Sequence, residues 1–215
     1  MNLHSLKKTT LLLCTGALLL SASVYGQRKS KDDTPDWTEQ STTAFKFREL
    51  GPATTSGRIA DLAVHPTKTS EMYLAMASSG VWKTTNNGTT WSPIFDAEGS
   101  YSIGCITIDP NDPNTIWVGT GENNNQRSVA YGDGVYVSHD GGQTWENVGL
   151  EESEHIGMIV VDPRDSKHVY VAAYGPLWSA GGDRGIYETR DGGKNWTQIL
   201  EVSEHTGFNE IHMDP

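Results

Sequence analysis

Cysteine is almost absent from this 215-residue chain, which has two, Cys14 and Cys105. Cys14 lies in a segment that is expected to be removed, so one thiol remains and an internal disulfide is excluded. Long apolar runs are also scarce. The run from Leu11 to Leu20 is shorter than the roughly 20 residues that a membrane-spanning helix needs, so no transmembrane span is expected.

Basic side chains are few, with 16 Lys and Arg against 27 Asp and Glu. Without Lys7 and Lys8, which lie in the segment expected to be removed, 14 basic residues face 27 acidic ones, a formal charge of −13. Binding to phosphate backbones needs clustered cations, so this balance argues against a nucleic-acid partner.

The first 26 residues have the pattern of an export signal. Two lysines precede an apolar run, and small or tolerated residues precede Gln27, which predicts cleavage near Gly26-Gln27 and a periplasmic or secreted location. Lipid attachment at Cys14 is disfavoured because bulky Leu13 precedes it. Residues 27–43 are polar and form a lead-in, and the folded part is expected at 44–215.

An eight-residue box occurs three times, at 84–91, 138–145 and 189–196, as TTNNGTTW, SHDGGQTW and TRDGGKNW. The Asp or Asn in its third position can accept hydrogen bonds from nearby backbone N–H groups, and the Gly in its fifth position can adopt a positive φ. The closing Trp can pack against a neighbouring sheet. Asn-Gly and Asp-Gly-Gly favour hairpin turns, so the boxes are assigned a structural role. The residues that carry this role are Asn86, Gly88, Trp91, Asp140, Gly142, Trp145, Asp191, Gly193 and Trp196.

Short segments rich in β-branched and aromatic residues surround each box, four to a repeat. They cover 59–64, 72–75, 80–84 and 91–95, then 104–108, 115–119, 134–138 and 145–148, then 157–161, 169–173, 185–189 and 196–200. Such repetition is typical of propellers. The expected fold class is all-β, a β-propeller with four-stranded antiparallel blades. The blades are placed at about 57–95, 101–150 and 156–200, with a further one starting at 207–215.

Three blades and the start of a fourth do not close a circle that takes roughly 4–8 blades, so the sequence is interpreted as an N-terminal fragment. Residues 44–50 alternate as a strand and precede the first repeat. We expect this strand to complete the last blade.

Strand direction sorts the connections onto two faces. The first–second and third–fourth connections, which are Pro-containing turns and boxes, share one face. The second–third connections and the passages between blades share the other, called here the loop face. Its long irregular loops, 121–133 and 174–184, are where ligands are expected. The residues predicted to bind ligand are Arg58, Asn123, Asn124, Arg127, Tyr131, Tyr174, Trp178, Arg184, His155 and His205, and the weak candidates for catalysis are Glu122, Asp133 and Asp183.

Glu154-His155 and Glu204-His205 lie 50 residues apart in equivalent passages between blades. Carboxylate and imidazole together suit zinc, but duplication of a loop explains the pairs better. The sequence therefore assigns no metal and no cofactor.

The three boxes resemble the Asp-box or BNR repeats of sialidases, xyloglucanase-type glycoside hydrolases and the sortilin (VPS10) propeller. Gly80-Val81-Trp82-Lys83-Thr84 and its partners are most similar to exported bacterial proteins of the sortilin-like BNR group. Two enzyme motifs of these families are not matched. The sialidase aromatic-Arg-Ile-Pro sequence corresponds to 57–60, which keeps only Arg58 and Ile59, and the xyloglucanase Asp before Gly-Gly corresponds to 77–80, which has no carboxylate.

This resemblance implies an exported propeller that binds a glycan or polypeptide on its loop face. The first alternative is a glycoside hydrolase of the sialidase or xyloglucanase kind, and the second is a structural or assembly propeller. Aromatic and amide side chains in the loops suit sugars, whereas a sortilin-like channel suits a peptide. Catalysis is left open.

Overall fold

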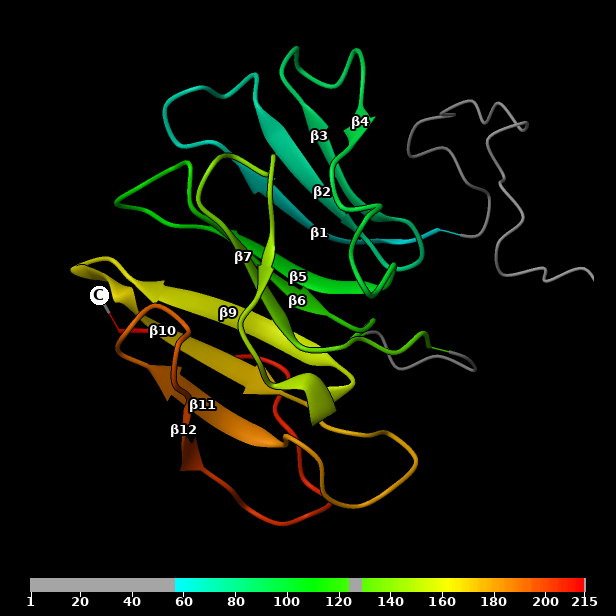
Figure 1. Ribbon diagram of the computed structural model, residues 1–215, viewed down its shortest axis with the longest axis vertical. Coiled ribbons are helices and arrows are strands. Elements are labelled where there is room, and N and C mark those ends of the chain that lie inside the picture. The colour runs from blue at the N-terminus through cyan, green and yellow to red at the C-terminus, as the bar shows by residue number, and fades with distance from the viewer. Residues whose placement is uncertain (1–56, 124–128, 215) are drawn as a thin grey trace, which may run out of the picture. The chain divides into compact units, whose positions relative to one another are not determined.

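The structure, a computed structural model, describes residues 57–123 and 129–214. These residues form three antiparallel sheets, each made of four strands that are consecutive in the chain (Figure 1). The first sheet has β1 (Ile59–Val64), β2 (Met72–Met76), β3 (Gly80–Thr84) and β4 (Ser92–Pro93). The second has β5 (Ile103–Ile108), β6 (Ile116–Thr120), β7 (Val135–Ser138) and β8 (Glu146–Asn147), and the third has β9 (Ile156–Asp162), β10 (Asp165–Ala173), β11 (Gly185–Thr189) and β12 (Thr197–Leu200). The predicted all-β class is confirmed.

The described residues contain no α-helix, only one 3₁₀ turn, η2 (Glu151–Ser153). Accordingly, this part of the chain has no helical segment with the length and apolarity to cross a bilayer.

Neighbouring sheets pack face to face, and their first strands β1, β5 and β9 lie side by side. One apolar cluster fills the space between the first and second sheets, with fully buried Tyr73 and Val81 facing Ile103 and Val118. A second cluster lies between the second and third sheets around Trp117. A third, smaller cluster of Leu74, Met76 and Trp82 belongs to the first sheet alone. Because the two larger cores lie between neighbouring sheets whose first strands are adjacent, the fourth strands become outer edges, as in propeller blades.

The boxes form the predicted turns. Ser138 Oγ accepts a hydrogen bond from Gly142 N at 2.9 Å, and Asp140 Oδ1 accepts from Gln143 N and Thr144 N, both at 2.9 Å. Gly88, Gly142 and Gly193 have φ of 77°, 86° and 93°, a region that side chains with a Cβ avoid. The predicted hairpin chemistry is therefore confirmed.

The residue before each turn proline also has a structural role. Asp109 Oδ1 accepts a hydrogen bond from Asn111 N at 2.7 Å, and Asp162 Oδ1 accepts from Arg164 N at 2.8 Å. In the first repeat His65 Nδ1 replaces the carboxylate and accepts from Thr67 N at 3.2 Å. These side-chain caps close the connections between first and second strands.

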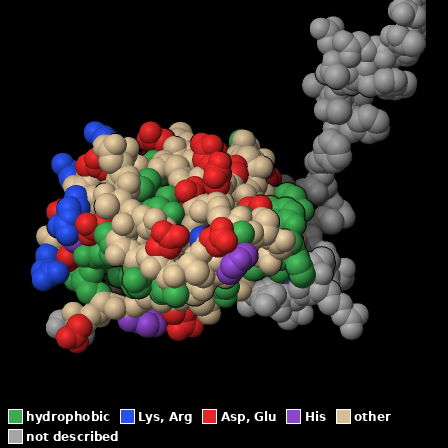
Figure 2. Space-filling view, turned by 90° about the horizontal axis from the view of Figure 1, so that it is seen from below, with side chains coloured by type: hydrophobic (Ala, Val, Ile, Leu, Met, Phe, Trp, Pro, Cys, Tyr) green, Lys and Arg blue, Asp and Glu red, His purple; other side chains and the backbone are tan. Residues whose placement is uncertain are grey.

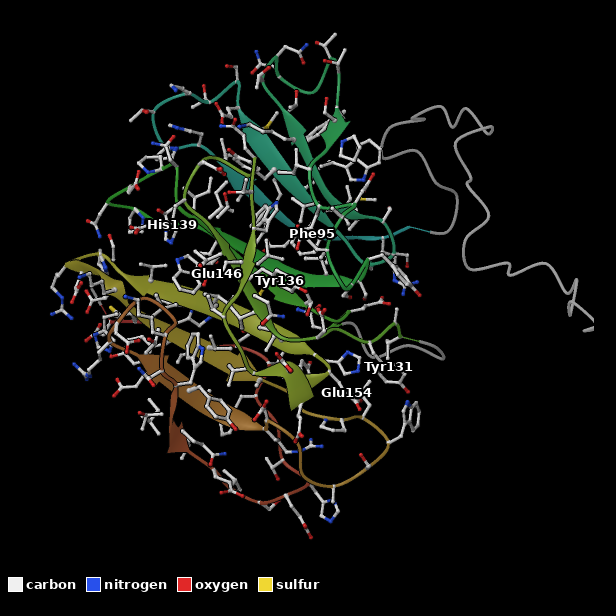
Figure 3. All side chains as sticks on the ribbon, viewed as in Figure 1. Phe95, Tyr131, Tyr136, His139, Glu146 and Glu154 are labelled. Carbon is white, nitrogen blue, oxygen red and sulfur yellow. The ribbon has the colours of Figure 1, made fainter. Side chains whose placement is uncertain are left out.

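The antiparallel order places the boxes and the irregular loops at opposite ends of the sheets. In the second sheet, His139 of the box and Tyr131 of the 121–133 loop lie beyond opposite ends of β7 (Figure 3). Glu154, in the passage between sheets, lies toward the Tyr131 end. The loop face inferred from strand direction is thus present in the structure.

Some strands differ from the predicted ranges. β4 and β8 have two residues each, because the box tryptophans Trp91 and Trp145 precede the ladder and Pro93 lacks an N–H group. β10 starts at Asp165, four residues early, because the Asp165–Asp162 pair extends it past a bulge. No strand is assigned within 207–214, the predicted start of a further blade. The predicted signal segment, lead-in and closing strand at 44–50 lie outside the described residues.

Candidate functional site

A cleft of about 720 Å³ opens on the loop face beside the third sheet. Its walls come from the β10–β11 loop and from the passage after β12. Four predicted ligand residues line it, Tyr174, Trp178, Arg184 and His205. We call this hollow the Trp178 cleft.

Trp178 is the most exposed large apolar residue of this cleft, at 72 %. Tyr174, the first residue of the same loop, is half-buried and continues the wall, with Leu177 between them. Exposing an indole to water is unfavourable unless a ligand or partner covers it, so an exposed Trp in a cleft points to a binding role. The flat π-face of the indole suits a sugar ring. The cleft therefore combines an aromatic platform with polar walls.

Arg184 lies under the loop that carries this platform and is 7 % exposed. Its guanidinium donates to the carbonyl oxygens of Tyr174 at 2.7 Å and Ser179 at 3.1 Å, and also to that of Pro176. Both Nη2 donors and one Nη1 donor are therefore engaged, whereas the buried Nε–H has no hydrogen-bond partner among the described residues. The residue was predicted to bind ligand, but its visible contacts are to the loop itself.

His205 lines the cleft, is exposed, and has its Nε2 3.6 Å from Glu204 Oε1. The backbone of Glu204 accepts a hydrogen bond from Gly181 N at 2.9 Å, just as the backbone of Glu154 accepts from Gly132 N at 2.7 Å. The duplicated Glu-His pairs thus share a backbone anchor for the neighbouring loop. In the part of the chain that the structure describes, no group of three or more His, Cys, Asp or Glu is placed to hold a metal ion.

A second group of residues lies at the beginnings of β1, β5 and β9, the first strands of the three sheets. Arg58, Ser102 and His155 occupy the same place in three successive sheets, because their carbonyl oxygens accept hydrogen bonds from Ala77 N, Gly121 N and Tyr174 N, at 2.7–2.9 Å. The sequence did not align these residues, since their side chains share no chemistry.

Glu122 lies among these equivalent positions and is 2 % exposed. Arg58 Nε donates to its Oε1 at 2.7 Å and Nη2 donates to the same oxygen, while its backbone N–H donates to Ser102 Oγ at 2.9 Å. The two residues thus pair across two sheets. Glu122 is thus held by Arg58 in this arrangement, while 44 % of the Arg58 side chain stays exposed.

His155 is fully buried beside this pair, with the ring of Tyr131 5.6 Å away. Burial lowers the pKa of His155, because a charged imidazole is poorly solvated there, and nearby Glu122 acts in the opposite direction. Tyr131 itself is 54 % exposed. Asn123 donates from Nδ2 to Gly157 O at 3.1 Å and borders a smaller cleft of about 250 Å³ between the first strands. Asn124 and Arg127 lie outside the described residues.

The other two catalytic candidates also hold structural contacts. Asp133 accepts hydrogen bonds from Tyr136 Oη at 2.7 Å and Thr120 Oγ1 at 3.3 Å. Asp183 accepts from Glu152 N at 3.0 Å and returns its own N–H to Glu152 O at 3.1 Å. Each carboxylate fastens a long loop to the framework.

Glu98 is a loop-face carboxyl that the sequence analysis passed over. Burial raises its pKa, and the charge of Asp133 adds to the rise. It belongs to the passage between the first and second sheets, which is the counterpart of the passages with Glu154 and Glu204. The equivalence of these three passages is the sequence signal by which Glu98 could have been found.

Charge is unevenly distributed over the third sheet. Four exposed basic residues belong to its turn and box at the end opposite the cleft, and in Figure 2 the Lys and Arg side chains gather at the left edge while acidic ones spread over the face. These residues are Arg164, Lys167, Arg190 and Lys194. Asp183 and Glu204 lie in the loops that form the cleft, whose lining includes Arg184 and His205.

Comparison with known proteins points to carbohydrate-active propellers. A family model described as BNR/Asp-box repeat matches residues 136–147, the second box with its flanking strands. The chain is 29 % identical over 148 residues to an oligoxyloglucan-reducing end-specific xyloglucanase of Emericella nidulans, an alignment that covers 66 % of this chain and 17 % of that protein.

Two solved structures agree with this. An ancestral GH74 enzyme superposes with a TM-score of 0.55 and 22 % identity over 68 % of this chain and 19 % of the other, which supports the fold. The Niastella koreensis GH74 enzyme gives a TM-score of 0.51 and 25 % identity over 64 % of this chain and 20 % of the other. The chain therefore spans about a fifth or less of the length of these relatives. The chain contains a BNR/Asp-box repeat at 136–147, and its all-β fold is similar to that of the GH74 enzymes.

Proposed function

We propose that this chain forms a glycan-binding part of a carbohydrate-active β-propeller, and that the Trp178 cleft holds a neutral oligosaccharide of the oligoxyloglucan type. The observation that carries the proposal is Trp178 itself, 72 % exposed at the wall of a cleft of about 720 Å³. The similarity to a xyloglucanase supports the choice of sugar.

We propose a neutral ligand because Arg58 and Arg184, the two arginines that the structure describes near the loop face, both hold contacts within the protein. Arg184 donates to three loop carbonyls and Arg58 binds Glu122. Asp183 and Glu204 add negative charge beside the cleft, so a sialic acid or uronic acid would meet repulsion without a compensating cation. Hydroxyl-bearing neutral rings need only stacking and neutral hydrogen bonds.

Hydrolysis is the second candidate function, favoured by the similarity to the Emericella nidulans enzyme. It requires an acid and a second carboxylate on the loop face, roughly 5–9.5 Å apart. Glu122, Asp133 and Asp183 are engaged in structural contacts, whereas Glu98 has the raised pKa that suits a general acid. Glu98 is therefore the first carboxyl to substitute when hydrolysis is tested.

Calorimetric titration of the full chain with oligoxyloglucan, sialyllactose and oligogalacturonate tests the proposal. We expect binding of oligoxyloglucan alone, a loss of about tenfold in affinity in Trp178→Ala, and no change in Lys194→Ala at the opposite end. Equal binding of the anionic sugars, or unchanged affinity in Trp178→Ala, would contradict it.

A reducing-end assay on the same oligosaccharide separates binding from hydrolysis. Turnover that disappears in Glu98→Gln while affinity persists would establish the second function. Absence of turnover, or turnover that survives in Glu98→Gln, would remove Glu98 from the reaction.

A further inference from the structure

We infer that Arg184 is a positioning residue for the Trp178 platform: it fixes the loop that presents the indole and acts on the ligand only through that loop. This inference rests on the proposed function for its ligand, but it concerns a contact set that exists without ligand. The evidence is the geometry of the 174–184 loop.

The guanidinium holds the loop on both sides of the indole. Its Nη1 donates to Tyr174 O, four residues before Trp178, and its Nη2 donates to Pro176 O and to Ser179 O, the residue directly after. Because these three carbonyls bind one planar guanidinium, the backbone on both sides of Trp178 is restrained together. The forked geometry is specific to arginine, because a lysine ammonium has no fixed plane.

The surroundings pack closely around Arg184. Gly175 has a φ of +73° and packs against it so closely that a Cβ there would meet Arg184 Cβ at 2.8 Å and Nε at 2.9 Å. The backbone of Arg184 is fixed as well, since its carbonyl accepts a hydrogen bond from Gln198 Nε2 of β12 at 2.7 Å. Arg184 is thus bound to the third sheet through its backbone and to the 174–184 loop through its side chain.

The far end of the loop is fastened to the framework by different contacts. Gly181 N donates to Glu204 O at 2.9 Å, and Asp183 exchanges two hydrogen bonds with Glu152. These contacts lie after Trp178 in the chain and do not reach 174–179. Tyr174 is also held by its own N–H, which donates to His155 O at 2.9 Å. Removing Arg184 would therefore free residues 175–179, with the indole, and leave both ends of the loop in place.

An indole that is fixed before binding loses little conformational entropy when a sugar stacks on it. We expect Arg184→Ala to weaken oligoxyloglucan binding by about tenfold, close to the effect of Trp178→Ala. The double variant should bind no more weakly than Trp178→Ala alone, because the arginine acts through the indole. Arg190→Ala is the matched control, since Arg190 flanks the other end of β11 and pairs with Glu188 at the surface.

Arg184→Lys keeps the charge and loses the fork, so it should resemble Arg184→Ala in affinity while it melts closer to the parent. If Arg184→Ala does not fold, this variant supplies the same comparison. Additive losses in the double variant, or parental affinity in both Arg184 variants, would overturn the inference.

A measurement without sugar separates this inference from the proposed function. In chain labelled with 5-fluorotryptophan, the ¹⁹F resonance of Trp178, assigned by its loss in Trp178→Phe, should be narrowed by motion in Arg184→Lys and unchanged in Arg190→Ala. If the resonance narrows in Arg184→Lys but Trp178→Ala binds sugar with parental affinity, the proposed function is refuted and the positioning role stands. An unchanged resonance in Arg184→Lys would refute the positioning role alone.

Discussion

The indole Nε1 of Trp145 donates a hydrogen bond of 2.7 Å to the carbonyl oxygen of Ile94, 51 residues earlier in the preceding sheet. Trp196 makes the same bond to Val148 O, also at 2.7 Å. In both cases the ring meets an aromatic side chain of the earlier sheet edge to face, Phe95 at 5.1 Å and Trp117 at 6.5 Å. The second and third boxes therefore each fasten their own sheet to the one before.

This joint makes Trp145→Phe a specific test of the box. Phe keeps most of the apolar contact and loses the bond to Ile94, so the free energy of unfolding in urea should fall by about 1 kcal/mol. Trp91→Phe is the control, because the Trp91 indole donates to no other residue within 57–123 and 129–214. An equal loss in both variants would mean that ring size, and not the bond, matters.

The boxes also predict how stability depends on pH. Hydrogen bonds from Thr144 lower the pKa of Asp140 from 3.8 to about 2, and those from Asn195 do the same for Asp191. A carboxyl whose pKa is lower in the folded state stabilises the fold above its unfolded pKa, and this contribution is lost as the pH falls through about 4 to about 2. The melting temperature should therefore drop over that range.

The first repeat supplies the matched substitution. Asn86 makes the same backbone contact, accepting from Thr90 N at 2.9 Å, without a titrating group. Asp140→Asn should fold and show a shallower fall between about pH 4 and pH 2 than the parent. If the variant with both Asp140→Asn and Asp191→Asn loses melting temperature as steeply as the parent over this pH range, other carboxyls govern acid unfolding.

The pair of Arg58 and Glu122 predicts an unequal response to two substitutions. Arg58→Ala leaves a carboxylate that is 2 % exposed without its cation, and we expect a loss of about 2–3 kcal/mol in the free energy of unfolding. Adding Glu122→Gln should restore part of this loss because the buried charge is gone. Chemical denaturation of both variants measures the difference.

Arg190→Ala serves as the control for this pair, since the bridge from Arg190 to Glu188 has 69 % of the arginine side chain exposed. Surface pairs contribute little, typically about 0–1 kcal/mol. A similar loss in Arg190→Ala and Arg58→Ala would show that burial of Glu122 is not what makes the first pair matter.

The sequence was sufficient for the scaffold because its signals are local. The Asp, Gly and Trp of each box act within eight residues, and strand direction alone placed the 121–133 and 174–184 loops on one face. The roles of single side chains were not predictable in the same way. Arg58 and Glu122 are 64 residues apart, and Arg184 binds carbonyls whose positions depend on the folded loop.

The lengths of the edge strands show the same limit. Residues 145–148 have the composition of a strand, but a ladder forms only where the register with β7 allows it, at Glu146 and Asn147. The cleft could be predicted only in part. Tyr174, Trp178 and His205 were predicted from their loops, whereas the distinction between a residue that faces ligand and one that holds the loop required coordinates.

The most direct test of the account is hydrogen–deuterium exchange of the full chain with and without saturating oligoxyloglucan. Peptides covering 174–184 and 203–207 should exchange more slowly with sugar, and those covering 84–91, 138–145 and 189–196 should not change. Protection confined to the boxes, or no protection anywhere despite measured binding, would contradict a glycan site at the Trp178 cleft.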